Sequence, residues 1–338
     1  MNEFGWAIVG PGAIAHRFAQ AVQQLPEARL VAVHGRDQGR AEAFARTWSE
    51  VGAAAVPVFI EIDAMLQDAS VDGVYIATPH AFHAATIRRC LLAGKPVLCE
   101  KPLVVNEALA SELVAISRQR GVFLMEALWT RFLPIYSTVN EWLSAQAIGE
   151  IRGLQSSFCF NVPFNPQTRH FDPALAGGSL LDVGIYNLSM TQWALRAALG
   201  QCPKLDSVAA SGVIGPTGVD HRVAASLEFS GGVVSQFQCG FDSMADRSFR
   251  IFGELGMISV PTHFWEATTA ILQRGDEPAE VVHRPFRING FEGEIEEAMR
   301  CITGGAIESP AMPHADTVAT AAWMDRIRAI VGVRYPFE

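Results

Sequence analysis

Apolar runs and helical patterns alternate along residues 1–126. The apolar runs predict six strands, at Gly5–Val9, Arg29–His34, Ala55–Val58, Gly73–Ala77, Pro96–Glu100 and Val122–Glu126. The stretches between them predict helices, at Ile14–Gln24, Gln38–Trp48, Ile62–Gln67, Ala81–Ala93 and Glu107–Arg120. Regular alternation with short connections is typical of an α/β fold, a doubly wound parallel sheet with helices on both faces.

The pattern changes after residue 126. Helices are predicted at Pro134–Ala147, Ser179–Ala198 with Ser179 as N-cap, Phe291–Thr303 and Thr317–Val331. Strands are predicted at Ile151–Val162, Val223–Phe229, Val233–Cys239, Phe249–Phe252 and Met257–Val260, the last four forming two hairpins. We therefore expect a C-terminal α+β domain with a mostly antiparallel sheet. One sheet face should be covered by helices and the other open and apolar, which predicts a homodimer through this sheet.

Composition and charge narrow the possible partners. Of the 338 residues, 49% are apolar and 18% are charged, the reverse of the balance in disordered chains. The net charge of −9 disfavours nucleic acid and anionic membranes. No signal peptide and no membrane-spanning run of ~18 apolar residues is expected. The six scattered cysteines lack Cys-x-x-Cys and zinc-type spacing, which favours a cytoplasmic protein with free thiols and no metal.

The first predicted strand ends in the pattern Gly-x-Gly-x-x-Ala, at Gly10, Gly12 and Ala15. A strand, a glycine-rich turn and a helix in this order are typical of a dinucleotide-binding site. Gly10 permits the tight turn, Gly12 lets a pyrophosphate approach the backbone, and Ala15 lets the helix pack closely on the strand. The N–H groups at the helix start would bind the pyrophosphate. The alternative is an ordinary turn that requires glycine.

The residues after the second predicted strand indicate which dinucleotide binds. An acidic residue there would bind the ribose 2′-hydroxyl of NAD, whereas this chain has Arg36, followed one helical turn later by Arg40. A guanidinium makes paired, charge-assisted bonds to a phosphate, and Gly35 would leave room for it. These residues predict NADP(H) in preference to NAD(H). Asp37 is the counter-argument, and we interpret it as the N-cap of the following helix.

The fourth predicted strand ends in Thr78, Pro79 and His80, with His83 one turn later. Ligands of open parallel sheets bind at the carboxyl ends of the strands, so we expect these residues to contact the coenzyme. The two histidines are candidate acids, but supporting neighbouring residues is their more common role.

Three further residues are candidates for catalysis. Glu100 and Lys101 end the fifth predicted strand. Burying a lysine in an apolar crevice costs free energy, so we interpret Lys101 as a functional residue; the alternative is that it is a surface lysine that closes the strand. Asp182 and Tyr186, four residues apart, share a face of the predicted helix. Gly184 lies between them and costs up to about 1 kcal/mol in a helix, so we interpret it as a point where a nicotinamide ring or a sugar comes close. Alone, Asp182 and Tyr186 would be interpreted as a polar helix face.

The sequence Glu100-Lys101-Pro102, together with Gly177–Tyr186, resembles the Gfo/Idh/MocA oxidoreductase family over nearly the whole chain. Tyr186 stands where many members have histidine, which is similar to a branch of NADP-dependent sugar and diol enzymes. The resemblance implies an NADP-binding Rossmann domain at residues 1–126 and a substrate-binding and dimerisation domain at residues 127–338. It also implies that Lys101 and Tyr186 are the catalytic pair. Residues bordering the coenzyme or substrate would be Trp129, Arg131 and Arg169.

We therefore expect reversible hydride transfer between NADP(H) and an alcohol carbon. Tyr186 would exchange the hydroxyl proton, Lys101 would favour its phenolate form, and Asp182 would orient these groups. The expected substrate is a sugar or related polyol, as for an aldose 1-dehydrogenase. The alternatives are a trans-dihydrodiol and a non-catalytic NADP-binding regulator. The expected binding residues are Gly10, Gly12, Ala13, Ile14, Ala15, Arg36, Arg40, Thr78, Pro79, His80, His83, Glu100, Lys101, Trp129 and Arg131 for the coenzyme, with Arg169, Asp182 and Tyr186 for the substrate.

Overall fold

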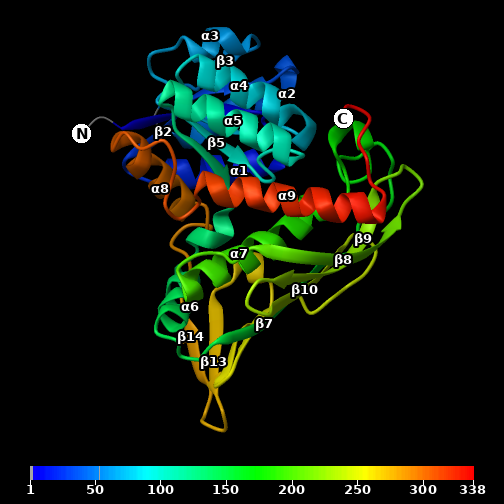
Figure 1. Cartoon of the computed structure of the whole chain (residues 1–338). Helices are drawn as coiled ribbons and strands as arrows, with labels where there is room; N and C mark the ends of the chain where they lie inside the picture. Colours follow the sequence, from blue (N-terminus) through cyan, green and yellow to red (C-terminus); the bar gives the residue numbers. More distant parts are fainter. Residues whose placement is uncertain (1–2, 53) are drawn as a thin grey trace. The chain divides into compact units, whose positions relative to one another are not determined.

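The computed structural model of the chain describes residues 3–52 and 54–338, and these form two compact units (Figure 1). The first unit consists of Met1–Val104, Ala108–Leu128 and Arg287–Thr317. The second consists of Val105–Glu107, Trp129–Phe286 and Val318–Glu338. The chain thus leaves the first unit after Leu128 and returns to it at Arg287, and nothing in the sequence pattern indicates this return.

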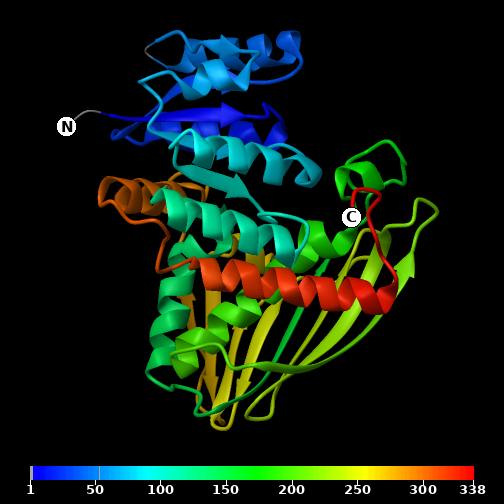
Figure 2. The same ribbon diagram turned by 45° about the horizontal axis from the view of Figure 1, so that its top comes forward.

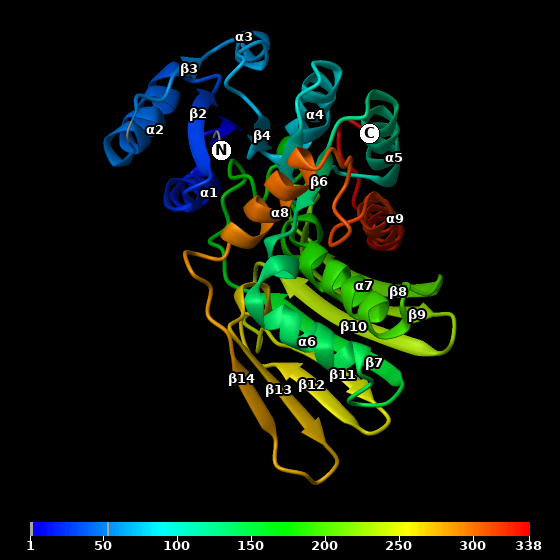
Figure 3. The same ribbon diagram turned by 90° about the vertical axis from the view of Figure 1, so that its left-hand side faces the viewer.

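The described part of the first unit contains a six-stranded sheet in the order β3-β2-β1-β4-β5-β6, with every neighbouring pair parallel. Helices cover both faces of the sheet (Figure 3), so the predicted doubly wound Rossmann arrangement is confirmed. The strands are β1 (Phe4–Val9), β2 (Ala28–His34), β3 (Val58–Phe59), β4 (Gly73–Ile76), β5 (Val97–Glu100) and β6 (Leu124–Ala127). The helices are α1 (Ala13–Gln24), α2 (Gln38–Val51), α3 (Ile62–Leu66), α4 (His83–Leu92), α5 (Glu107–Arg120) and α8 (Glu292–Thr303).

The third strand differs from its prediction. The pattern indicates a strand over Ala55–Val58, but β3 contains two residues, Val58 and Phe59, paired with Val33 and His34. Pro57 precedes them and has no N–H to donate, which limits how far the pairing extends at this edge of the sheet.

The second unit contains an eight-stranded sheet over residues 151–283, all of which are described, in the order β14-β13-β12-β11-β7-β10-β9-β8. The central strands β7 and β10 are parallel and the other neighbouring pairs are antiparallel, so the predicted mostly antiparallel sheet is confirmed. Three of the strands were not predicted: β8, β13 and β14. The strands are β7 (Ile151–Cys159), β8 (Leu205–Ile214), β9 (Asp220–Phe229), β10 (Val233–Gly240), β11 (Phe249–Gly253), β12 (Gly256–Val260), β13 (Thr269–Arg274) and β14 (Glu280–His283).

Helices cover one face of this sheet. The helices α6 (Pro134–Ser144) and α7 (Ile185–Leu199) lie on the same face (Figures 2 and 3). The last helix of the chain is α9 (His314–Val331).

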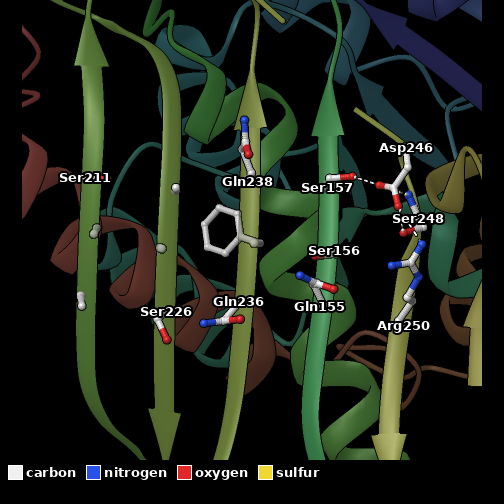
Figure 4. Close-up of a pocket in the computed structure, with 15 residues that line it drawn as sticks. Gln155, Ser156, Ser157, Ser211, Ser226, Gln236, Gln238, Asp246, Ser248 and Arg250 are labelled. Carbon is white, nitrogen blue, oxygen red and sulfur yellow. Dashed lines mark hydrogen bonds and ion pairs between the residues drawn. The ribbon is translucent and has the colours of Figure 1, made fainter. Parts of the chain in front are cut away.

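The opposite face of the eight-stranded sheet is open and polar (Figure 4). Gln155 on β7 pairs in register with Gln236 on β10, and Ser157 pairs with Gln238. Together with small residues of β8 and β9 they line a groove of about 610 Å³. The expectation of an apolar open face is therefore wrong, because the outward positions of these strands carry amides, hydroxyls and alanines.

Candidate functional site

The glycine-rich turn has the shape that a pyrophosphate requires. Gly10 has φ +90°, and a Cβ on it would lie 2.9 Å from the backbone at Ala77 and Thr78. A Cβ on Gly12 would meet no atom of the described residues within 4 Å, so space is open above the start of α1. Ala15 is fully buried, whereas Ala13 and Ile14 are exposed. An open backbone surface at a helix N-terminus fits the phosphates of a dinucleotide.

The residues after β2 present two exposed guanidiniums. Arg36 and Arg40 are both exposed, and the Arg36 guanidinium lies 4.7 Å from the centre of the Phe82 ring. Asp37 accepts a 3.0 Å hydrogen bond from the backbone N–H of Arg40, so its interpretation as the N-cap of α2 is confirmed. The room expected beside Gly35 is instead filled, because a Cβ there would lie 3.1 Å from Pro11 and 3.2 Å from Ala41.

His83 connects the loops that follow β4 and β5. Its ring is fully buried, with Nε2 2.7 Å from the carbonyl oxygen of Thr78 and Nδ1 2.9 Å from that of Pro102. Burial lowers its pKa, so the neutral ring donates to one of these carbonyls at a time. This geometry favours a supporting role for His83. His80 lies beside it, with its ring centre 5.8 Å away, and Pro79 begins the short helix that contains it.

Glu100 is held inside the first unit, directly before Lys101. Its carboxylate is 8% exposed and accepts a 2.5 Å hydrogen bond from the hydroxyl of Tyr75, whose pKa burial raises. Glu126, on β6, accepts a 2.8 Å bond from the backbone N–H of Leu103. The chain on either side of Lys101 is therefore held in place, at Glu100 by Tyr75 and at Leu103 by Glu126. The sequence did not suggest this support role of Glu126.

Tyr186 and Asp182 in the second unit both have buried side chains with defined partners. The Tyr186 hydroxyl accepts a 3.2 Å hydrogen bond from the indole N–H of Trp129. Asp182 accepts a 3.0 Å bond from Arg169. Arg131 donates 3.0 and 2.9 Å bonds to the hydroxyl and carbonyl of Ser189 on α7. The structure thus brings together Trp129 with Tyr186, and Arg169 with Asp182.

An aromatic surface borders Tyr186. The Phe158 ring centre lies 5.5 Å from that of Tyr186, and Phe158 stacks on Trp265 with ring centres 3.4 Å apart. Neither residue belongs to a motif in the sequence. Phe158 sits in a predicted strand where an aromatic residue is unremarkable, and Trp265 lies outside every predicted element.

Two details of the helix that carries Tyr186 correct the sequence interpretation. Leu180–Gly184 forms a wide π-helical turn that leads into α7, and Ser179 does not cap it. What comes close to Gly184 is protein, since a Cβ there would lie 2.9 Å from Leu180 Cδ1 and 3.0 Å from Cys239 Sγ. Its interpretation as a point of ligand approach is wrong, because the core of the second unit fills the space.

Two negative findings concern the described residues, 3–52 and 54–338. In this part of the chain, no group of three or more His, Cys, Asp or Glu side chains could hold a metal ion. Within the same ranges, every helix is too short or too polar to cross a membrane. Lys101 belongs to the first unit and Tyr186 to the second, so their meeting stays a prediction.

Comparison with known protein families covers most of the chain. Residues 4–128 match a family model described as "Oxidoreductase family, NAD-binding Rossmann fold", and residues 136–259 match "GFO/IDH/MocA C-terminal domain". The chain belongs to the Gfo/Idh/MocA oxidoreductase family. It is an NAD(P)-dependent dehydrogenase that acts on CH–OH groups.

Relatives of the chain span its whole length. It is 34% identical over 339 residues to trans-1,2-dihydrobenzene-1,2-diol dehydrogenase of Mus musculus, covering 98% of each chain. A solved structure of KijD10, a 3-ketoreductase from Actinomadura kijaniata in complex with NADP and TDP-benzene, is 26% identical, with a TM-score of 0.85 and 98% of each chain covered. The aldose-aldose oxidoreductase of Caulobacter crescentus, 22% identical with a TM-score of 0.85 over 98% of each chain, shares the fold.

The packing at Gly184 gives a first prediction. In Gly184→Ala the new Cβ would crowd Leu180 and Cys239, so we expect the free energy of unfolding to fall by about 1–3 kcal/mol, measured by urea titration. Adding Cys239→Ala removes the sulfur and should restore part of this loss, read as the coupling in a double-mutant cycle. Unchanged stability in Gly184→Ala would contradict the packing account.

Proposed function

We propose that this protein is an NADP(H)-dependent dehydrogenase whose substrate is a vicinal diol on a flat apolar ring, of the trans-dihydrodiol type. The observation that carries the proposal is the Tyr186 hydroxyl, which accepts from Trp129 beside the stacked pair of Phe158 and Trp265. Aromatic surfaces favour planar apolar ligands. The name of the 34% identical mouse relative supports the same substrate class.

Residues of the first unit would hold the coenzyme. The backbone of residues 10–15 would bind the pyrophosphate, and Arg36 and Arg40 the 2′-phosphate; both arginines are exposed. Asp37 does not compete for the ribose, because it caps α2. When bound, the coenzyme supplies or accepts the hydride. That KijD10 was solved with NADP supports the preference for NADP over NAD.

Tyr186 would move the proton of the reacting hydroxyl. An indole N–H can only donate, so the bond from Trp129 stabilises negative charge on the phenolic oxygen. The same bond directs the phenol's own proton towards another acceptor, which we propose is the substrate oxygen. Lys101 would stabilise negative charge that develops on that oxygen. Lysine and tyrosine variants of KijD10 have also been solved with NADP.

A sugar or polyol is the second candidate substrate. Asp182 and Arg169 form a 3.0 Å ion pair in which the carboxylate side chain is 5% exposed and the guanidinium is 50% exposed. A partly exposed charged pair can bind hydroxyl groups, and Asp182 would then orient one of them.

We also propose that the protein is a cytoplasmic homodimer. The six cysteines, all within the described residues, are free thiols, which suits a reducing compartment. The dimer would form through the open face of the eight-stranded sheet. Amide side chains such as Gln155 and Gln236 both donate and accept, so such a face can pair with its own copy.

The substrate class is tested by a screen. Reduction of NADP⁺ and NAD⁺ is followed with a panel of trans-dihydrodiols, aldoses and polyols. We expect the highest kcat/KM with NADP⁺ and a trans-dihydrodiol. Turnover restricted to aldoses would select the second candidate, and turnover with neither class would refute the proposed function.

The roles of Tyr186 and Lys101 give a second prediction. Tyr186→Phe and Lys101→Met should each lower kcat by about 10²–10⁴-fold, because each removes a group that moves or stabilises charge. The Kd for NADP⁺ should stay within a few fold in Tyr186→Phe. Tyr136→Phe is the matched control, since Tyr136 is a buried tyrosine of the same unit bonded to the Phe264 carbonyl. Near-normal turnover in the Tyr186 or Lys101 variant would refute the assignment.

Coenzyme preference gives a third prediction. Arg36→Ala should raise the Kd for NADP⁺ about 10–100-fold, the equivalent of roughly 1.5–3 kcal/mol for a charged hydrogen bond. The Kd for NAD⁺ should be unchanged, as measured by calorimetric titration. Arg46→Ala, an exposed arginine further along α2, is the control. Equal weakening of both coenzymes would argue against a 2′-phosphate contact.

A further inference from the structure

Buried side chains from distant parts of the chain hold the segment that precedes the π-helical turn. Asp220, at the start of β9, is 0% exposed. Its Oδ2 accepts two 2.7 Å hydrogen bonds, one from the hydroxyl of Ser179 and one from the backbone N–H of Leu180. The hydroxyl of Tyr335 donates a 2.7 Å bond to the carbonyl of Gly177. Residues 177–180 are thereby fixed by side chains far away in sequence.

The second oxygen of Asp220 fits closely against Gly178. Its Oδ1 finds no hydrogen-bond partner among the described residues and lies 2.4 Å from where a Cβ on Gly178 would be. The backbone at Gly178 also has φ +116°, a conformation that residues with a side chain rarely adopt. The carboxylate therefore occupies the space that any side chain at residue 178 would need.

Burying a carboxylate costs free energy, so its presence at this position points to a role. Burial raises the pKa of Asp220 to about 6, against hydrogen bonds from Ser179 and Leu180 that lower it. The other titratable groups that interact with it are Cys239 and Tyr335, whose pKa values burial also raises. Asp220 is thus the member of this cluster that changes charge near neutral pH. A neutral side chain would avoid the cost of burying that charge.

The turn that Asp220 holds leads directly to the proposed catalytic tyrosine. Leu180–Gly184 contains Asp182 and continues into α7, whose second residue is Tyr186. A π-helical turn is rare and is frequently found at a functional site. Here Asp220 binds the residues at its start and Cys239 packs against its end.

We propose that Asp220 is a positioning residue for Tyr186, which keeps the phenol on the indole N–H of Trp129 by fixing the start of the helix. This inference rests on the proposed function, in which Tyr186 moves the proton. Asp220 acts through Ser179 and Leu180 and is not itself placed at the reacting atoms.

Variants of Asp220 and Ser179 test this role. We expect Asp220→Ala to lower kcat about tenfold or more, with the Kd for NADP⁺ within twofold of wild type, because the residues proposed to bind the coenzyme's phosphates lie in the other unit. Asp220→Asn keeps an oxygen acceptor but carries no charge, so its kcat should stay at the lower level that the wild type shows when Asp220 is protonated. Ser179→Ala should give a smaller loss. In the wild type, kcat should rise with pH through an apparent pKa near 6 as the carboxylate ionises, and this step should be absent in Asp220→Asn.

The outcomes separate failure of this proposal from failure of the proposed function. Tyr186→Phe is measured in parallel, and if it is inactive while Asp220→Ala keeps wild-type kcat and pH profile, the positioning role is refuted. If Asp220→Ala does not fold, wild-type behaviour of both Asp220→Asn and Ser179→Ala refutes it. If the wild type turns over no substrate, crystal structures of the wild type and of the Asp220 variant test the positioning role instead. The Tyr186–Trp129 distance, 3.2 Å in the native chain, should lengthen in the Asp220 variant, and an unchanged bond would refute the positioning role.

Discussion

In the first unit the imidazole of His83 is buried between the carbonyl oxygens of Thr78 and Pro102. Each carbonyl lies in a loop that follows a strand, beyond the ladder that would otherwise provide its partner. A polar group that folding removes from water must find a new partner, or it costs free energy. Because Pro79 and Lys101 lie in these same loops, their geometry depends on how this requirement is met.

The second unit meets the same requirement with a carboxylate. Asp220 accepts the hydrogen bonds that the start of the helix offers, and the ordinary N-cap expected at Ser179 is replaced by this contact from another strand. Glu126 plays a comparable part in the first unit, where it accepts from Leu103 and from Thr317. In both units, buried acids hold the segments next to the proposed catalytic residues.

Local sequence patterns predicted the features that depend on neighbouring residues. The glycine turn, the N-cap at Asp37, the parallel sheet and both hairpins were visible because turns, caps and alternation are short-range properties. The position of Gly184 against Cys239 could not be predicted, since it depends on a strand about 55 residues away. The stacking of Phe158 on Trp265 and the support from Asp220 are likewise contacts between distant segments.

The polar open face of the sheet was mispredicted for a related reason. Alternation identifies which residues share a face, but it does not make the uncovered face apolar. Gln236 and Gln238 alternate with buried Phe237, so the strand has one apolar face and one polar face. The missed strand β8 is largely exposed and lacks a clear alternation.

The return of residues 287–317 to the first unit has a consequence for synthesis on the ribosome. The backbone N–H of Leu124, on the outermost strand β6, donates a 3.0 Å bond to the carbonyl of Ile307, and Nε2 of His314 lies 2.8 Å from the carbonyl oxygen of Leu124. Until the ribosome has made that late segment, β6 is an uncovered strand edge of the kind that pairs with other chains. The nascent protein therefore exposes the edge of β6 until residues 287–317 have been made. The first unit completes its fold only after this late segment has emerged from the ribosome.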